Sequence, residues 1–146
     1  RNIAQHLSSG DQLLLGVDLV KNRDVMHAAY NDSAGVTASF NKNLLVRINH
    51  QLGGHFEPDA FCHVSFWNET ASRIELHLES TCLQSVRVDA LDTTLQFYQG
   101  ERIHTENSYK YTVDCLEDLL QRGGFEVENI WTDPDFWFAV SLGVIP

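Results

Sequence analysis

Apolar residues change their spacing several times along the chain, and each change predicts a new element of secondary structure. Residues 2–7 are predicted to be the last turns of a helix, and residues 13–19 (LLLGVDL) form an almost uninterrupted apolar run. Such a run is typical of a strand buried on both faces, as in the middle of a parallel sheet. Residues 24–30 predict a short helix, and apolar positions at helical spacing predict a longer amphipathic helix over residues 33–52.

From Phe61 onward apolar residues alternate with polar ones, which indicates strands rather than helices. The clearest case is residues 73–79 (RIELHLE), in which Ile74, Leu76 and Leu78 share one face. Short polar connections separate the strands, so we expect a largely antiparallel sheet. The predicted strands are residues 61–67, 73–79, 83–88, 93–98 and 102–108.

The last part of the chain returns to helix and strand. Residues 113–122 predict a helix, and residues 125–132 and 136–144 predict two strands joined around Asp133 and Pro134. A link this short favours an antiparallel pair. The order of buried strand, helices, antiparallel block, helix and strand pair predicts an α/β sheet protein with an antiparallel subdomain inserted late in its chain.

Composition narrows the classes of partner. Twenty acidic residues against 10 basic ones give a net charge of -10, which repels phosphate backbones and anionic lipids, so we expect no nucleic acid and no membrane as partners. No apolar run reaches the about 18 residues of a membrane-spanning helix. The three cysteines, Cys62, Cys82 and Cys115, are widely spaced and predict a soluble protein of the reducing cytoplasm. Because the chain starts at Arg1, inside a predicted helix, we expect it to be a piece of a larger protein.

The sequence carries few signs of chemistry of its own. Its seven histidines have no spacing typical of zinc or iron, so we predict no metal, although His77 between Glu75 and Glu79 leaves a metal cluster as an alternative. No segment resembles a nucleophile elbow, and Gly123 and Gly124 follow a helix rather than a strand, which does not fit a phosphate or dinucleotide loop. We therefore assign no catalytic residue and expect a recognition surface.

Two polar segments are candidates for such a surface. Residues 28–32 (AAYND) place a tyrosine and polar side chains at a helix break. In residues 105–108 (TENS), Glu106 and Ser108 are two positions apart on an extended segment and share a face. A carboxylate beside a hydroxyl can hold a ring with two nitrogens, because the acid fixes one N–H and the hydroxyl adapts to the other. A solvated strand end and a helix cap explain the same patterns.

With these segments in place, the sequence resembles the histidine Nα-methyltransferases of ergothioneine biosynthesis, which use S-adenosylmethionine (SAM) to trimethylate histidine to hercynine. The family has a Rossmann-like catalytic fold and a second, partly inserted substrate domain. The resemblance implies that residues 1–20 and 111–146 belong to the catalytic sheet and residues 21–110 to the substrate-recognition domain. It rests on residues 10–21 (GDQLLLGVDLVK), 29–32 (AYND), 35–38 (GVTA), 40–43 (FNKN), 74–76 (IEL), 100–101 (GE), 105–110 (TENSYK) and 131–133 (WTD).

The resemblance also implies roles for side chains. Tyr30 would bind the substrate carboxylate, and Glu106 and Ser108 would hold the imidazole. The sequence departs from the family at Leu76, where methionine is usual, and at Asn107, which replaces an apolar residue. The residues expected to shape the pocket are Thr37, Phe40 and Leu76.

SAM is the methyl donor that the resemblance implies, but its glycine-rich loop would lie before Arg1. We therefore expect this chain alone to be inactive and to self-associate through an exposed sheet edge at residues 13–19. One alternative is a related enzyme for another amine, such as a tryptophan derivative; Glu106 argues against it because a carboxylate facing an indole leaves a buried charge uncompensated. The other is a binding module without catalysis.

Overall fold

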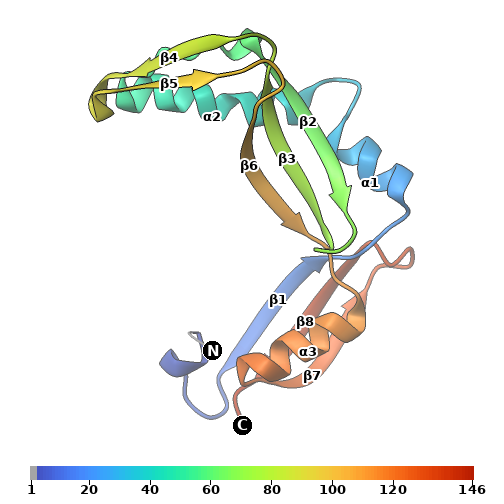
Figure 1. Cartoon of the computed structure of the whole chain (residues 1–146). Helices are drawn as coiled ribbons and strands as arrows, with labels where there is room; N and C mark the ends of the chain where they lie inside the picture. The colour runs from blue at the N-terminus through green and yellow to red at the C-terminus, as the bar shows by residue number, and fades with distance from the viewer. Residues whose placement is uncertain (1–2) are drawn as a thin grey trace. The chain divides into compact units, whose positions relative to one another are not determined.

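The structure is a computed structural model that describes residues 3–146, and it has the mixed α/β composition that the sequence predicts. The chain divides into two compact units, which we call the central unit (Arg23–Ser108) and the discontinuous unit (residues up to Asn22 together with Tyr109–Pro146). Within the described residues, no helix is both long and apolar enough to cross a membrane. The main elements, labelled in Figure 1, are β1 (Gln12–Asp18), α1 (Arg23–Tyr30), α2 (Val36–Leu52), β2 (Phe61–Asn68), β3 (Arg73–Ser80), β4 (Gln84–Val88), β5 (Thr93–Phe97), β6 (Arg102–Tyr109), α3 (Val113–Gly123), β7 (Glu126–Thr132) and β8 (Phe138–Val144).

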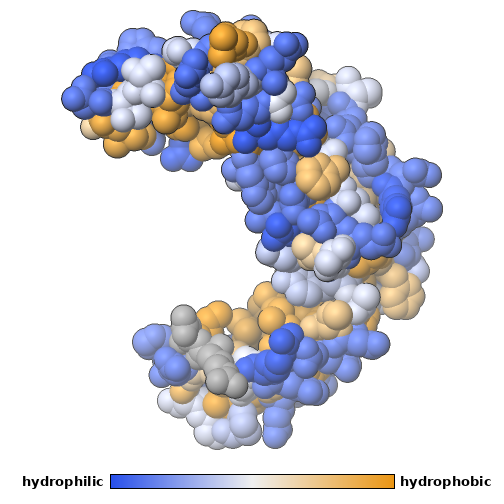
Figure 2. Space-filling model, viewed as in Figure 1, coloured by the Kyte–Doolittle hydropathy of each residue, from blue (hydrophilic) through white to orange (hydrophobic). Residues whose placement is uncertain are grey.

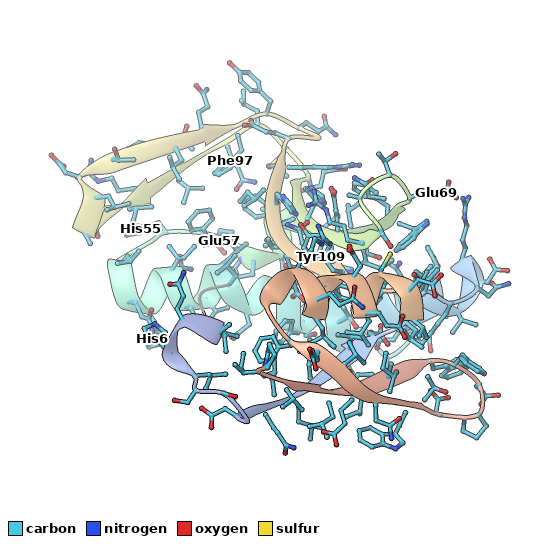
Figure 3. All side chains as sticks on the ribbon, turned by 90° about the horizontal axis from the view of Figure 1, so that it is seen from below. His6, His55, Glu57, Glu69, Phe97 and Tyr109 are labelled. Atoms are coloured by element: carbon cyan, nitrogen blue, oxygen red, sulfur yellow. The ribbon has the colours of Figure 1, made fainter. Side chains whose placement is uncertain are left out.

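The central unit is built from two small sheets and two helices. Strands β2, β3 and β6 form one sheet, and the hairpin β4–β5 forms the other. The pairs β2–β3 and β4–β5 are antiparallel, as the short connections predict. Leu45 of α2 is fully buried in a core that also contains Phe61 of β2, Leu78 of β3 and Phe97 of β5, the last labelled in Figure 3. This core fixes α2 against both sheets.

Helix α2 begins three residues later than the predicted Ser33. The carboxylate of Asp32 accepts hydrogen bonds from the backbone N–H groups of Val36 at 2.8 Å and Thr37 at 2.9 Å. Gly35 precedes the helix with a φ of 71°, a left-handed conformation that glycine adopts without a steric penalty. The polar cluster is therefore the cap of α2 rather than its first turn.

The discontinuous unit holds a three-stranded sheet in the order β1-β8-β7, with both pairs antiparallel. The prediction that β1 is buried on both faces, as in a parallel sheet, is wrong for the described residues. Val17 packs with Leu116 and Leu120 of α3, but Leu14 on the opposite face is 66% exposed. The apolar run predicts burial, yet α3 covers only one face of β1 and β8 pairs with only one of its edges. Figure 2 shows that apolar residues also gather on the visible face of this unit.

The predicted strand pair at the end of the chain is confirmed as β7 and β8, but β8 begins at Phe138 rather than Phe136. Phe136 has a φ of 55°, which is strained for a residue with a large side chain. The carboxylate of Asp133 holds this turn by accepting hydrogen bonds from the backbone N–H groups of Asp135, Trp137 and Phe138. These bonds, that from Phe138 above all, lower the pKa of Asp133.

Only a short 3-10 turn, Ala4–His6, lies where residues 2–7 predict the end of a helix. Position 2 of that prediction lies outside the described residues.

Candidate functional site

A side-chain hydrogen bond joins the end of α1 to the end of β6. Tyr30 is the last residue of α1, and Ser108 is the last but one of β6. Their hydroxyl oxygens lie 2.7 Å apart, and either group can be the donor. The bond brings together two residues predicted to bind substrate. Hydroxyls both donate and accept, so the pair suits polar ligand groups such as carboxylates, amines and imidazole N–H groups.

Glu106 lies in a groove between β6 and α2 with a volume of about 200 Å³. The ring of Phe40 on α2 lines the same groove, and this residue is 68% exposed, so its apolar face is open to a ligand. An aromatic face close to a carboxylate suits a flat ring with polar N–H edges. The other lining residues are Asn41, Asn43, Leu44, Arg47 and Thr105.

The side chains of β6 change their alternation close to Glu106. In a regular strand, successive side chains point to opposite faces. Thr105 and Glu106 are consecutive, yet both line the groove, and His104 reaches Asn107 with its Nε2 atom 2.8 Å from Oδ1. Glu106 therefore lies beside α2, and Ser108, two residues on, contacts Tyr30 of α1.

The backbone of Tyr30 is also held in place, by a hydrogen bond to its carbonyl oxygen. His63 Nε2 lies 2.9 Å from the carbonyl oxygen of Tyr30, and His63 Nδ1 lies 2.9 Å from Nδ2 of the buried Asn41. Because the amide of Asn41 donates, Nδ1 accepts and Nε2–H donates to Tyr30. Asn41 also donates to the carbonyl of His77 at 3.0 Å. The sequence prediction missed His63 and Asn41, since nothing in their local spacing points to Tyr30.

Thr37 and Leu76 do not line the groove but stabilise the elements around it. The Thr37 hydroxyl donates to the carbonyl of Ala29 at 3.4 Å and so links the start of α2 to α1. Leu76 is only 1% exposed and packs with Met26 in a small core, against which Tyr30 lies. The structure therefore brings Tyr30 and Ser108 into direct contact, places Phe40 and Glu106 in one groove, and leaves Thr37 and Leu76 in supporting positions.

Asp32 carries the largest shift of acidity in this region. Hydrogen bonds from the backbone N–H groups of Thr37 and Val36 stabilise its charged form and lower its pKa to about 2. The carboxylate is therefore charged at neutral pH and is committed to the start of α2. Its role in the structure is that of a cap, the simpler of the two explanations that the sequence offers for this segment.

In the discontinuous unit, Gly124 and Asp18 are both engaged by other groups of the chain. Gly124 ends α3 with a φ of 96°, and its backbone N–H bonds to the carbonyls of Gln121 and Leu120, so it is used within the helix cap. Burial raises the pKa of Asp18, but hydrogen bonds from Lys110, at 2.5 Å, and Lys21 outweigh this effect and lower it. We therefore assign no described residue to the cofactor.

Two bacterial proteins are similar to nearly the whole chain. The histidine N-alpha-methyltransferase of Mycolicibacterium smegmatis is 44% identical over 142 residues, which are 97% of this chain and 44% of that protein. The histidine N-alpha-methyltransferase of Mycobacterium tuberculosis is 43% identical over 140 residues, 96% of this chain and 44% of that protein. The chain thus spans less than half the length of these two relatives.

A fungal protein and a family model extend the comparison. Ergothioneine biosynthesis protein 1 of Schizosaccharomyces pombe is 24% identical over 128 residues, 87% of this chain and 16% of that protein. The model of the SAM-dependent, histidine-specific methyltransferases matches residues 1–144. Since this match covers all but the last two residues, the chain belongs to the histidine-specific, SAM-dependent methyltransferase family.

Proposed function

We propose that the central unit is the amino-acid-binding part of an enzyme that transfers three methyl groups from SAM to the α-amino nitrogen of L-histidine, giving hercynine for ergothioneine biosynthesis. The observation that carries the proposal is the contact of 2.7 Å between Tyr30 and Ser108, with Glu106 two residues along β6 in a groove beside Phe40. The names of the relatives from Mycolicibacterium smegmatis and Mycobacterium tuberculosis agree with this substrate.

Each side chain then has a role that follows from its chemistry. Glu106 accepts one imidazole N–H, and Ser108 bonds the other ring nitrogen as donor or acceptor. Tyr30 donates to the substrate carboxylate, and Phe40 covers the ring plane. Methyl transfer needs a neutral amine aligned with the donor, so holding histidine at both ends promotes the reaction chiefly by positioning and by excluding water.

We further propose that the discontinuous unit is part of a Rossmann-like catalytic sheet, that residues 21–110 form an inserted substrate domain, and that SAM binds to the part of such enzymes that this chain does not include. On this proposal the chain alone is inactive. A cytoplasmic location stays a prediction, which the three exposed free thiols of Cys62, Cys82 and Cys115 support.

The test uses a full-length family member that contains this segment. The purified protein is incubated with SAM and L-histidine, or with SAM and L-tryptophan, and the products are identified by mass spectrometry. We expect trimethylated histidine and little product from tryptophan. Preferred methylation of tryptophan would support the alternative substrate instead, and histidine binding without methyl transfer would favour a non-catalytic binding module.

A further inference from the structure

A cluster of metal-ligating side chains lies on the central sheet, apart from the groove of Glu106. Glu75 and His77 are two positions apart on β3 and therefore point to the same face, and His104 lies on the neighbouring strand β6. One ligand atom from each of the three residues lies within 4.8 Å of the other two. The sequence offers Glu75 and His77 as part of an alternative metal cluster, but not His104, because this third member follows 27 positions after His77 and joins it only when β6 pairs with β3.

The two residues on β3 are held nearly buried. The side chain of Glu75 is 10% exposed, and its Oε1 accepts hydrogen bonds from Arg73 at 2.7 Å and Asn68 at 2.8 Å. Its second oxygen, Oε2, lies 3.9 Å from Nε2 of His77, beyond hydrogen-bond distance. The side chain of His77 is 11% exposed, and its Nδ1 is the one buried side-chain nitrogen or oxygen in residues 3–146 without a hydrogen-bond partner.

We propose that Glu75, His77 and His104 bind a divalent transition-metal ion such as Zn²⁺. Two imidazoles and one carboxylate are a common ligand set for Zn²⁺ and suit Cu²⁺ and Ni²⁺ as well, whereas Mg²⁺ and Ca²⁺ prefer oxygen ligands alone. Ligand atoms around one zinc ion lie about 3 to 4 Å apart, given metal–ligand distances of about 2.0–2.2 Å. The ligand atoms of the cluster, which lie within 4.8 Å of one another, must therefore move closer together and His104 must turn to reach that geometry.

The neighbouring charges permit a cation at this position. Two guanidinium groups lie close by, and each already faces a carboxylate. Arg73 pairs with Glu75, and Arg102 pairs with Glu79 at 2.7 Å. The surroundings are thus balanced, and the carboxylate of Glu75 can use Oε2 for a metal while Oε1 keeps its bonds to Arg73 and Asn68.

His104 must turn for the metal to bind. Its ring stacks on that of His77 with 4.7 Å between centroids and an angle of 16° between planes, so the lone pairs of the two rings lie in nearly parallel planes. An imidazole binds a metal in the plane of its ring, so both rings cannot reach one ion in this arrangement. His104 is exposed and can rotate, but its Nε2 now lies 2.8 Å from Oδ1 of Asn107. The metal and Asn107 therefore compete for His104.

The test is calorimetric titration of the chain with Zn²⁺, together with the visible absorption of bound Co²⁺. We expect one ion per chain and an affinity that falls by at least about tenfold in His77→Phe, which keeps an aromatic ring in the stack. His104 is exposed, so His104→Gln should leave the fold intact and serves as the second variant. We expect it to lose Zn²⁺ affinity to a similar extent. Asn107→Ala should bind Zn²⁺ more tightly, since it removes the shorter of the two contacts of His104 Nε2 and leaves only that to the carbonyl oxygen of Glu106 at 3.2 Å.

The matched control is His50→Asn, which removes an exposed histidine from α2 and should leave the affinity unchanged. Wild-type affinity in both His77→Phe and His104→Gln would overturn the proposal. The proposal would also be overturned if the chain bound several Zn²⁺ ions weakly and His50→Asn reduced this binding as much as His77→Phe does. Weaker binding in Asn107→Ala would contradict the competition for His104. Because every readout is metal binding, the result is independent of whether the parent enzyme methylates histidine.

Discussion

The hydroxyl groups of Tyr30 and Ser108 lie 2.7 Å apart although 78 positions separate them in the sequence. Tyr30 is placed by the end of α1, by the carbonyl bond to His63 and by the packing of its ring near Leu76. Ser108 is placed by β6. The contact therefore depends on the correct docking of a helix end on a strand end, and any ligand that bonds both hydroxyls binds only the folded central unit.

Removing either hydroxyl should destabilise the chain. Tyr30→Phe and Ser108→Ala each remove one partner of a neutral hydrogen bond, a loss of about 0.5–1.5 kcal/mol in the free energy of unfolding. The double variant should lose less than the sum of the two, because the bond can be lost only once. Urea denaturation of the four proteins measures this coupling. Tyr98→Phe, which removes an exposed hydroxyl, is the control, and strictly additive losses for Tyr30 and Ser108 would show that the contact is absent in solution.

Stability should fall in acid partly because of Asp32. Its pKa is about 2 in the folded chain and 3.8 ordinarily, so its contribution is fully present above about pH 4 and is lost as the pH falls through about 2. In Asp32→Asn this contribution is missing, so stability should depend less on pH between about pH 4 and pH 2. Denaturation at several pH values tests this, and an identical acid dependence in both proteins would rule out the cap as its source.

The sequence predicts the elements well where one local rule decides them. The alternation around Ile74 and the short helix ending at Tyr30 both appear in the structure, the helix beginning one residue earlier than predicted. It fails where the outcome depends on what covers a segment. Residues 13–19 are apolar enough for a buried strand, but Leu14 is exposed because no described element packs on its face. The start of α2 shifts because Asp32, not Ser33, bonds the first free N–H groups.

The site is predictable only in part, for a similar reason. Resemblance to a family places Tyr30, Glu106 and Ser108 together, and the structure brings Tyr30 and Ser108 into contact. The resemblance does not reveal His63, which links Tyr30 of α1 to Asn41 of α2 by hydrogen bonds from β2. Regular alternation also puts Thr105 and Glu106 on opposite faces, whereas both residues line the groove. Such long-range contacts leave no mark in local spacing.

Leu76 offers a test of shape against volume. Leu76→Met restores the residue usual in the family with similar volume, so it should cost less than about 1.5 kcal/mol. Leu76→Ala leaves a cavity beside Met26 and should cost about 2–5 kcal/mol. Thermal and urea denaturation distinguish the two. Equal losses in both variants would indicate that the small core around Leu76 requires the branched side chain rather than a filled volume.

The free edge of β1 should cause the chain to self-associate. Among the described strands β1 pairs only with β8, and Leu14 adds an exposed apolar side chain to that edge strand. Leu14→Lys places a charge there and should reduce association, because charged side chains protect sheet edges. Sedimentation velocity over a range of concentrations gives the answer. A monomeric wild-type chain at high concentration would contradict the prediction.

Glu106 should set the preference for histidine in a full-length enzyme that contains this segment. Glu106→Ala removes a charge-assisted hydrogen bond to the imidazole, a contact worth about 1.5–3 kcal/mol. This corresponds to a loss of about tenfold to hundredfold in kcat/KM for histidine. Tryptophan, which has no second ring nitrogen to bond the carboxylate, should lose far less.

Glu106→Gln and Glu117→Ala sharpen the comparison. Glu106→Gln keeps an acceptor oxygen without the charge and should lie between wild type and Glu106→Ala. Glu117→Ala removes an exposed carboxylate from α3 and should leave kcat/KM unchanged for both substrates. The measurement is kcat/KM for histidine and tryptophan in all four proteins. If Glu106→Ala lowered kcat/KM for both substrates by the same factor, the carboxylate would act on the fold of β6 and α2 rather than on the substrate ring. The histidine preference would then have to come from other groove residues.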